Sequence, residues 1–476
     1  MSQEQLTSIK SIIKRDGRTE DFDLKKIEDA IFQAAESVGG KDRNLAHSLS
    51  IKVLESLQKK FKDKPTVDNV QDLVEKTLIE EGHARTAKAF ILFRHQKDQE
   101  RERRALIIGS ETEDSNLSFS NEALKVLERR YLIRNPEGQV IETPKGMLQR
   151  VAKNIALADK YYGASKEDVK KTEEEFYSLI AELKFLPNSP TLMNAATITQ
   201  QLSSCFVLPV EDNIGGIFGA LKDAALIHQR GSGTGFSFSR LRSKGDFVRS
   251  NVGVAAGPVA FMKVYDKALE AIKQGGIRPG ANMAVLRVDH SDIIRFIEAK
   301  RGTGRLKNFN LSVAVTDRFM KAVEEDREYY LTNPKTEKYV GRMKARDVFA
   351  MIIQNAWKNG DPGLLFIDEI NRKHPGKHLG EIETTNQCGE APLLPNEGIV
   401  LGSLNLNNFI DAEKEDIDWL ELEKAIRTAV HFLDNVIDMN SYPTKKIEED
   451  TKRTRKFGLG VMGFADALSK LKKAKI

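Results

Sequence analysis

The sequence predicts an α/β fold with parallel strands from about residue 186 onward, preceded by helical units. Two observations lead to this prediction. Short apolar runs recur along this part of the chain, namely SCFVLPV, GFSFSRL, NFNLSVAV and GLLFIDEI. Helical stretches such as IFGALKDAALIHQR separate them. Strands that alternate with helices form parallel sheets, because each helix carries the chain back across the sheet.

The bulk composition is that of an ordinary globular protein. A length of 476 residues exceeds the size of a single core, so we expect two or three domains. A net charge of +5 is too small for this length to indicate a nucleic-acid partner. Two cysteines cannot form a disulfide framework, which favours a cytoplasmic protein. No signal region or membrane-length apolar run is visible, so we expect no membrane partner.

The first hundred residues predict a hairpin and four helices. SIIKRDGRTEDFD alternates like two strands, with Asp16 and Gly17 as the turn pair. The next helix presents an apolar face that consists of Ile27, Ile31, Ala34 and Val38. A later helix is expected to begin after an N-cap at Thr66 and to end at Gly82. The charged end of ARTAKAFILFRHQKDQERERR indicates a solvated helix.

Three further segments complete the secondary-structure prediction. Residues 110–135 are polar and mixed, which predicts a linker, whereas residues 145–185 predict helices. The final stretch, GLGVMGFADALSKLKKAKI, predicts one more helix.

Basic side chains surround the hairpin turn. Lys14 and Arg15 flank it, and Lys26 lies on the following helix. Such a cluster can bind a triphosphate through charge-assisted hydrogen bonds. The alternative is a solvent-exposed basic hairpin without a ligand.

Two glycine-rich segments and one histidine pair invite ligand assignments. RGSGTGFSFSRLR departs from GxGxxG and precedes a strand pattern, so it is not a dinucleotide loop. QGGIRPGANM, residues 274–283, is either a surface loop or a binding loop. His374 and His378 have metal-ligand spacing, but Pro375 and Gly376 interrupt any helix between them, so we expect no metal site.

The segment TTNQCGEAPLLPNEG contains the candidate reaction centre. If it is extended, Asn386, Cys388 and Glu390 share one face. A thiol, an acid and an amide that converge are typical of a reaction site. The neighbouring carboxylate opposes thiolate formation, which favours a neutral thiol or a radical. The alternative is a cysteine that serves as a small buried apolar residue.

Long motifs resemble the catalytic subunit of ribonucleotide reductases. TTNQCGEAPLLPNEGIVLGSLNL is similar to the finger loop of that family, which carries Asn-x-Cys-x-Glu. Other segments resemble the same family in the same order, namely SSCFVLPVEDNIGGIFGALKDAALIHQRGSGTGFSFSRLRSKGD, GGIRPGANMAVLRVDHSDIIRFIEAK and GLGVMGFADAL. IIKRDGRTEDFDLKKIEDAI resembles its ATP-cone. GSGTGFSFSRLRSKGD is more similar to adenosylcobalamin-dependent (class II) members than to those that use a separate radical subunit.

The resemblance implies a three-part organisation. Residues 1–100 would form the mainly helical ATP-cone and residues 101–185 a helical N-terminal domain. Residues 186–476 would form the first part, about half, of a ten-stranded α/β barrel with the finger loop inside it.

The resemblance also implies roles in a thiyl-radical reduction of ribonucleotides to 2′-deoxyribonucleotides. Cys388 would become the radical that removes the ribose 3′-hydrogen, and Glu390 would take the 3′-hydroxyl proton. Asn386 would hold a ribose hydroxyl. Cys205 would protonate the leaving 2′-hydroxyl and supply an electron.

Binding residues follow from the same resemblance. The substrate site would include Ser189, Ser204 and Ser232. The deoxynucleotide effector that sets base specificity would be held by Asp212, Arg242, Arg249 and Arg278, the last in the loop 275–280. ATP or dATP would be held in the cone by Lys14, Arg15, Glu20, Lys26, Thr66 and Lys88. The resemblance also implies adenosylcobalamin as a cofactor. It implies a homo-oligomer and a thioredoxin-like reductant as protein partners.

Two departures from the family pattern leave alternatives open. Ile399 stands where the family has the cysteine that pairs with Cys205, so the reducing equivalents arrive differently or the usual cycle does not operate. The similarity ends about halfway through the barrel, which suggests a split enzyme with a complementary C-terminal half-chain, or a truncated product. A catalytically inactive nucleotide-sensing fragment is the rival reading. A glycyl-radical enzyme would need a C-terminal glycine loop, which this sequence does not contain.

Overall fold

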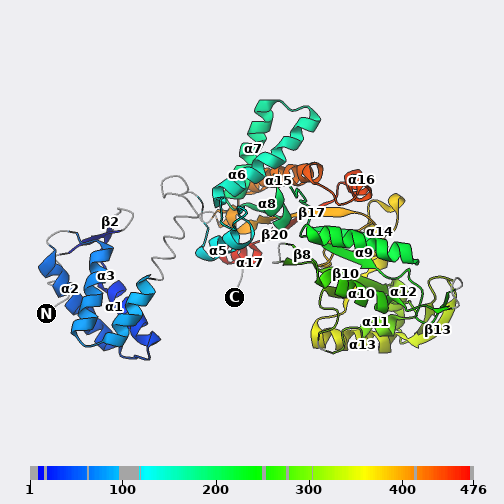
Figure 1. The fold of residues 1–476 in the computed structure, drawn as a ribbon, viewed down its shortest axis with the longest axis horizontal. Coiled ribbons are helices and arrows are strands. Elements are labelled where there is room, and N and C mark those ends of the chain that lie inside the picture. Colours follow the sequence, from blue (N-terminus) through cyan, green and yellow to red (C-terminus); the bar gives the residue numbers. More distant parts are fainter. Residues whose placement is uncertain are drawn as a thin grey trace. The chain divides into compact units, whose positions relative to one another are not determined.

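The computed structural model separates the chain into two compact units, Met1–Glu113 and Asp114–Ile476, which are considered individually (Figure 1). The structure describes residues 9–14, 19–61, 64–95, 117, 119–248, 253–274, 278–302, 304–411 and 415–471. In these residues, no helix has both the length and the apolar character needed to cross a bilayer.

The first unit begins with the predicted hairpin. Strand β1 (Ser11–Ile13) pairs antiparallel with β2 (Thr19–Asp21), while the turn pair Asp16-Gly17 lies outside the described residues. Helix α1 (Leu24–Ser37) follows and is capped by the Asp23 side chain. Its buried residues are Ile27, Ile31 and Ala34, as predicted. Val38 is wrong as a member of this face, because it lies beyond the helix and is 40% exposed.

Further helices complete the core of this unit. They are α2 (Arg43–Lys60) and α3 (Val67–Glu80), and residues 84–95 are also helical. The predicted N-cap is confirmed, because Thr66 and Asn69 form a reciprocal capping box at the start of α3. Gly82 follows α3 with a φ of 82°, a left-handed conformation that favours glycine. Apolar side chains from all these helices form one buried cluster.

The second unit opens with helices. The predicted linker at 110–135 is wrong in part, since it contains α5 (Asn121–Arg130). The Ser120 side chain caps this helix, and two buried leucines dock it. The prediction of helices over 145–185 is confirmed by α6 (Pro144–Ala156), η2 (Leu157–Tyr162) and α7 (Lys166–Ala181).

An eight-stranded sheet forms the centre of the second unit. Its members are β3 (Phe185–Pro187), β4 (Cys205–Pro209), β5 (Gly233–Ser237), β10 (Asn282–Arg287), β11 (Phe309–Val315), β14 (Gly363–Phe366), β17 (Gly398–Asn405) and β20 (Phe457–Met462). Their order is β14-β11-β10-β5-β4-β17-β20, and β3 also pairs with β17. The first five strands in this order are parallel, as predicted. Strand β17 runs antiparallel to β4, and β20 runs parallel to β17, so the direction reverses at β4 and β17.

Helices pack against the parallel part of the sheet (Figure 1). They are α9 (Ile214–Gln229), α10 (Pro258–Glu270), α11 (Ile293–Ile297), α12 (Asp317–Glu324) and α13 (Ala345–Asn359). Their apolar faces and the outer faces of the strands form the largest core cluster. Phe236, Phe238 and Tyr265 pack edge-on or tilted inside it. This core fixes the strand ends from which the candidate site is built.

Two predicted boundaries are wrong. The run GLLFIDEI is a strand only to Phe366, because its last four residues belong to α14 (Ile367–Lys373). The final stretch is not one helix. Its first residues form β20, followed by Gly463 at a φ of 68° and then α17 (Phe464–Lys470). In the final stretch, pairing of Phe457–Met462 with β17 overrides the local helical pattern.

The remaining elements are short strands and connecting helices. They are α8 (Ser189–Asn194), β6 (Phe247–Val248), β7 (Gly253–Val254), β8 (Lys273–Gln274), β9 (Arg278–Pro279), β12 (Glu328–Thr332), β13 (Tyr339–Lys344), η3 (Lys377–Leu379), β15 (Thr384–Thr385), β16 (Pro392–Leu393), η4 (Leu406–Phe409), β18 (Ile410–Asp411), β19 (Asp416–Ile417), α15 (Trp419–Met439) and α16 (Lys445–Thr454).

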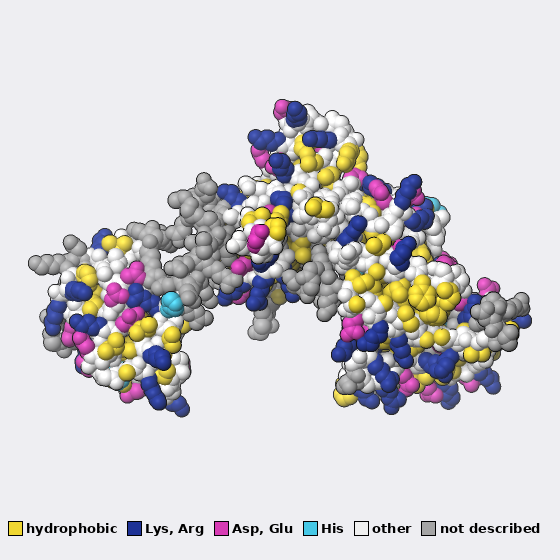
Figure 2. Space-filling model, viewed as in Figure 1, with side chains coloured by type: hydrophobic (Ala, Val, Ile, Leu, Met, Phe, Trp, Pro, Cys, Tyr) yellow, Lys and Arg dark blue, Asp and Glu magenta, His cyan; other side chains and the backbone are white. Residues whose placement is uncertain are grey.

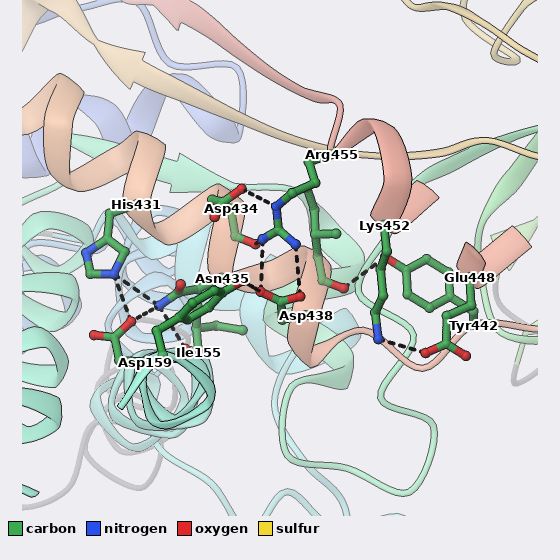
Figure 3. Close-up of polar contacts among 12 residues, drawn as sticks. Ile155, Asp159, His431, Asp434, Asn435, Asp438, Tyr442, Glu448, Lys452 and Arg455 are labelled. Atoms are coloured by element: carbon green, nitrogen blue, oxygen red, sulfur yellow. Dashed lines mark hydrogen bonds and ion pairs between the residues drawn. The ribbon is translucent and has the colours of Figure 1, made fainter. Parts of the chain in front are cut away.

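A polar network ties α15 to the elements beside it (Figure 3). Asp159 of η2 accepts hydrogen bonds from His431 and Asn435 of α15, at 2.8 and 2.6 Å. Arg455, just after α16, donates to the carboxylates of Asp434 and Asp438. The network therefore links the helical region, α15 and the segment that enters β20.

Candidate active site

The candidate site lies in a turn between β15 and β16. Residues 386–390 are not extended, so the prediction that Asn386, Cys388 and Glu390 share one strand face is wrong. The Asn386 side-chain oxygen instead accepts the backbone N–H groups of Gly389 and Ala391, at 3.2 and 3.0 Å. Gly389 has a φ of 95°, which permits the reversal. The turn presents its side chains in different directions.

The side-chain amide of Asn386 nevertheless connects Glu390 to the other cysteine, Cys205. Its Nδ2 donates to Glu390 Oε1 at 2.6 Å and to Cys205 Sγ at 3.2 Å. Asn386 is fully buried, whereas Cys388 and Glu390 are exposed. Three of the four predicted catalytic residues thus form one hydrogen-bonded group, and the Cys388 thiol lies on the accessible side of the same turn.

Cys205 lies at the start of β4 and is only 2% exposed. Its sulfur accepts a second amide hydrogen bond, from Gln387 Nε2 at 3.1 Å, and its thiol contacts Ser204 Oγ at 3.2 Å. Burial raises the pKa of this thiol to about 11, because it disfavours the charged form more strongly than the hydrogen bonds favour it. Cys205 therefore keeps its proton at neutral pH and can act as a proton donor.

Ile399 occupies the cross-strand position beside this thiol. The register pairs Ile399 of β17 with Cys205 of β4, and both belong to one buried apolar cluster. In the part of the chain that the structure describes, neither Cys205 nor Cys388 forms a disulfide.

Close packing of backbone holds the turn in place. A Cβ at Gly235 would overlap the carbonyl oxygen of Thr385, and a Cβ at Gly233 would lie 2.5 Å from Gln387 Cδ. The Asn310 side chain also donates to the Gln387 carbonyl at 2.8 Å. The glycines of the GSGTGF motif therefore permit the close approach of the turn to β5.

The three predicted substrate serines have different surroundings. Ser204 lies against the Cys205 thiol. Ser232 is buried and bonded on both sides, donating to the Ser203 carbonyl at 2.6 Å and accepting from Gln201 at 2.8 Å. Ser189 Oγ lies 2.9 Å from the Tyr131 hydroxyl. Of these three serines, only Ser204 therefore contacts the group formed by Cys205, Asn386 and Glu390.

A large groove adjoins the turn. Its volume is about 900 Å³, and Glu390, Ala391 and Pro392 line it together with residues of β14, β17 and β20. Strands β14 and β20 are the two end strands of the sheet, so the groove lies between the two ends of the sheet. Its lining is mainly apolar. Its size suits either a small-molecule ligand larger than a nucleotide or a segment of polypeptide.

A second cavity brings together two of the predicted effector residues. It has a volume of about 530 Å³ and is lined in part by Asp212, Arg242 and Lys335. The Asp212 carboxylate accepts the Arg242 backbone N–H at 3.1 Å and its Nε at 2.8 Å. Arg249 lies outside the described residues, and the structure gives only the backbone of Arg278, in β9.

The first unit contains a cavity of about 370 Å³ that Lys14 and Lys26 line. Glu20 lies between these lysines, 2.6 Å from each ammonium group. The hydrogen bond from Lys14, and then that from Lys26, lowers the Glu20 pKa to about 2. Thr66 and Lys88 are not among the residues that line the cavity, and Arg15 lies outside the described residues.

The sequence reasoning missed three groups. Gln387 was overlooked because alternation selects every second residue, whereas a turn brings neighbours to the same sulfur. Lys335 comes from a hairpin that no motif marked. Phe22 and Phe90 add aromatic surface to the cavity of the first unit, and their apolar spacing is the signal that could have indicated it.

Metal binding has no structural basis in the described residues. No group of three or more histidine, cysteine, aspartate or glutamate side chains is placed to hold an ion there. The His374 ring is buried and lies against Gly376, and His378 lies in η3.

Comparison with known families matches three consecutive segments. Residues 10–99 match the ATP cone domain, and residues 117–200 match the ribonucleotide reductase all-alpha domain. Residues 203–474, more than half of the chain, match the ribonucleotide reductase barrel domain.

Individual relatives agree with these matches. The vitamin B12-dependent ribonucleoside-diphosphate reductase of Thermoplasma acidophilum is 44% identical over 97% of this chain and 67% of its own length. The protein of the same name from Mycobacterium tuberculosis H37Rv is 42% identical over 96% of this chain and 64% of its own. The ribonucleoside-diphosphate reductase large subunit of Vaccinia virus is 32% identical over 74% of this chain. The chain spans about two thirds of the length of the two B12-dependent relatives.

Proposed function

The chain belongs to the ribonucleotide reductase family, and from this premise we propose that it reduces ribonucleotides to 2′-deoxyribonucleotides by thiyl-radical chemistry at Cys388. One observation carries the proposal. A single buried amide, that of Asn386, is bonded both to Glu390 and to the Cys205 thiol, in the turn that exposes Cys388.

The proposed roles follow from protonation and access. The exposed Cys388 sulfur removes the 3′-hydrogen of the ribose, and the exposed Glu390 carboxylate takes the proton of the 3′-hydroxyl. Cys205 retains its proton at neutral pH, so it can protonate the 2′-hydroxyl as this group leaves. Asn386 orients the acid and the thiol relative to each other. Its side chain is buried and its donors and acceptor are engaged within the turn, so the expected contact with a ribose hydroxyl is not part of this proposal.

We propose adenosylcobalamin as the radical source, as in the B12-dependent relatives. The fit rests on the exposed Cys388 thiol and on the 900 Å³ groove beside the turn. The groove residues Glu390, Ala391 and Pro392 would face the bound cofactor. When bound, the cofactor supplies the radical that oxidises the Cys388 thiol. The protein's own contribution is to expose this sulfur while it buries Cys205.

The reductant must come from elsewhere than β17. Formation of one deoxynucleotide consumes two electrons, of which Cys205 supplies one, and Ile399 cannot supply the other as a second cysteine would. We therefore propose that the thiol of an external thioredoxin-like protein supplies the other electron and forms a mixed disulfide with Cys205, which a second thiol of that protein then reduces.

We propose nucleotide control at two further cavities. ATP or dATP would occupy the cavity beside Lys14 and Lys26, where two ammonium groups and aromatic side chains suit a nucleotide. A deoxynucleoside triphosphate effector would occupy the cavity beside Asp212 and Arg242.

Assembly is part of the proposal. Hydrophobic side chains gather over the face on which α9 and α10 lie (Figure 2), and Ile214 and Phe218 of α9 are 65% and 46% exposed. Such a face suits a second copy of the chain. The open edges of β14 and β20, the two end strands of the sheet, would pair with a complementary C-terminal half-chain that completes the barrel.

Co-expression tests the activity. The chain is produced together with the C-terminal third of the Thermoplasma relative and assayed for deoxynucleotide formation with and without adenosylcobalamin. We expect cobalamin-dependent product, at least about 100-fold less of it in Cys388→Ala and in Glu390→Gln, and unchanged product in the surface variant Lys358→Gln. If Cys388→Ala is as active as the parent, the role of Cys388 is wrong.

The rival function gives a different result in the same experiment. A nucleotide-sensing fragment would bind dATP and the effector in calorimetry, with a dependence on Lys26 and Arg242, yet would give no product with any complementary chain.

A further inference from the structure

We propose that Lys335, in the turn between β12 and β13, is a phosphate-binding residue of the cavity beside Asp212 and Arg242. The inference rests on the proposed effector function and adds a contact to it. The ligand class is a nucleoside triphosphate, whose terminal phosphates need cations. Lys335 lines this cavity although it comes from a hairpin far from Asp212 in the sequence.

The charged side chains of the cavity differ in whether they are already engaged in an ion pair. Asp212, Arg242 and Lys335 are the charged side chains among its described lining residues. Arg242 is already engaged, because its Nε donates to the Asp212 carboxylate at 2.8 Å and its Nη2 to the Asp212 carbonyl at 3.2 Å. Lys335 makes no ion pair with any described residue. Lys335 can therefore bind an anion in the cavity without the loss of an existing ion pair.

The hairpin turn is fixed to the wall of the cavity. Asn333 is buried, and its Nδ2 donates to Asp246 at 2.8 Å. The Asn333 side-chain oxygen accepts the backbone N–H groups of Lys335 and Thr336, at 2.9 and 3.2 Å. The backbone carbonyl of Asp246 accepts the N–H of Ala255 at 2.8 Å, and Ala255 lines the cavity. One buried side chain thus places the Lys335 backbone relative to the cavity.

Two helices begin at the same cavity. Asn213 and Ile214 at the start of α9 line it, as does Gly257, which precedes α10. Helix α10 has no side-chain cap at its N-terminus. Amide groups and the positive ends of two helix dipoles therefore point to the region that Lys335 approaches, and they add to its attraction for phosphate.

The rest of the lining suits the nucleoside. Ile214, Ile217, Leu241, Val254 and Phe261 give the cavity an apolar part. A cavity of about 530 Å³ is within the range of small-ligand sites. The division into an apolar part and a cationic part matches a base and a polyphosphate.

Calorimetry on the full chain tests the inference. The ligands are dTTP, dTDP and dTMP, because a thymine nucleotide separates this cavity from the one proposed for ATP and dATP. We expect Lys335→Gln to weaken dTTP binding by about three- to ten-fold, with a smaller effect on dTDP and little on dTMP. The loss should shrink as salt rises from 50 to 500 mM, since salt screens an exposed charge.

Lys338→Gln is the matched control, since Lys338 belongs to the same hairpin, is exposed and does not line the cavity. It should bind dTTP like the parent. If Arg242→Gln weakens dTTP binding while Lys335→Gln does not, the inference about Lys335 is overturned and the effector site stands. If the parent chain does not bind dTTP, the effector proposal itself fails, and the inference fails with it.

Discussion

Ile399 lies directly opposite Cys205 where β17 runs antiparallel to β4. Residues that face each other in this way have Cα atoms about 4.5 to 5.5 Å apart, which is within the range that a disulfide spans. The strand pairing therefore provides the place for a second sulfur, and the chain fills it with a branched apolar side chain. The usual exchange of electrons between two neighbouring thiols is excluded at this position by residue type alone.

The first prediction concerns Ile399→Cys in a Cys388→Ala background. We expect a disulfide between residues 205 and 399 under mild oxidation, because the pairing already places the two residues side by side. Mass spectrometry of the alkylated protein should show the loss of both free thiols. The control is Val400→Cys, whose side chain points to the other face of β17 and should stay reduced. Two free thiols in Ile399→Cys after oxidation would contradict the register.

The second prediction concerns Gln387, whose Nε2 donates to the Cys205 sulfur. Gln387→Met removes this donor at similar volume, so the thiolate loses stabilisation and the thiol pKa should rise further. In a Cys388→Ala background, we expect alkylation of Cys205 at pH 9 to slow by about three- to ten-fold. Gln354→Met, on the exposed side of α13, should react like the parent. An unchanged pH profile in Gln387→Met would refute the role of this hydrogen bond.

The third prediction compares two glycines. Gly235→Ala forces a methyl group against the Thr385 carbonyl, so it should destabilise the second unit by about 1–3 kcal/mol and displace the turn at residues 386–390. Gly219→Ala meets no atom within 4 Å in α9 and should stabilise by about 0.5–1 kcal/mol, because alanine favours a helix. Urea unfolding measures both. Equal effects of the two substitutions would rule out the close approach.

The fourth prediction concerns pH and Asp159. Burial by itself would raise the pKa of this carboxyl, but hydrogen bonds from Asn435, Thr172 and His431 outweigh it and lower the pKa. A lowered folded-state pKa stabilises the fold above the unfolded value of about 3.9, and this contribution is lost as the pH falls through the folded value. Acid should therefore loosen the contact between η2 and α15.

Urea unfolding between pH 7 and pH 2.5 provides the measurement. Asp159→Asn should be less stable than the parent at pH 7 by about 1–3 kcal/mol and should lose less on acidification. The exposed Asp347→Asn is the control and should follow the parent curve. A variant curve parallel to that of the parent would show that Asp159 contributes nothing to the acid dependence.

Much of the fold could be predicted from local patterns. The helical face of Ile27 and Ile31, the N-cap at Thr66 and the parallel strands from β4 to β14 all follow from spacing and capping chemistry that a short window contains. The boundaries failed where a distant segment decides them. Residues 457–462 pair with β17, and no window around them contains that information.

The candidate site divides in the same way. The sequence by itself determined which chemical groups exist, namely two cysteines, an adjacent acid and amide, and an isoleucine at position 399. Only the tertiary structure decided that Cys205 is the buried thiol, that Gln387 and Asn386 both solvate it, and that Ile399 faces it. The physical reason is that strand register and burial depend on contacts between residues almost two hundred positions apart. Burial raises the pKa of the Cys205 thiol and hydrogen bonds lower it, and among these bonds only the one to Ser204 involves a neighbour in the chain.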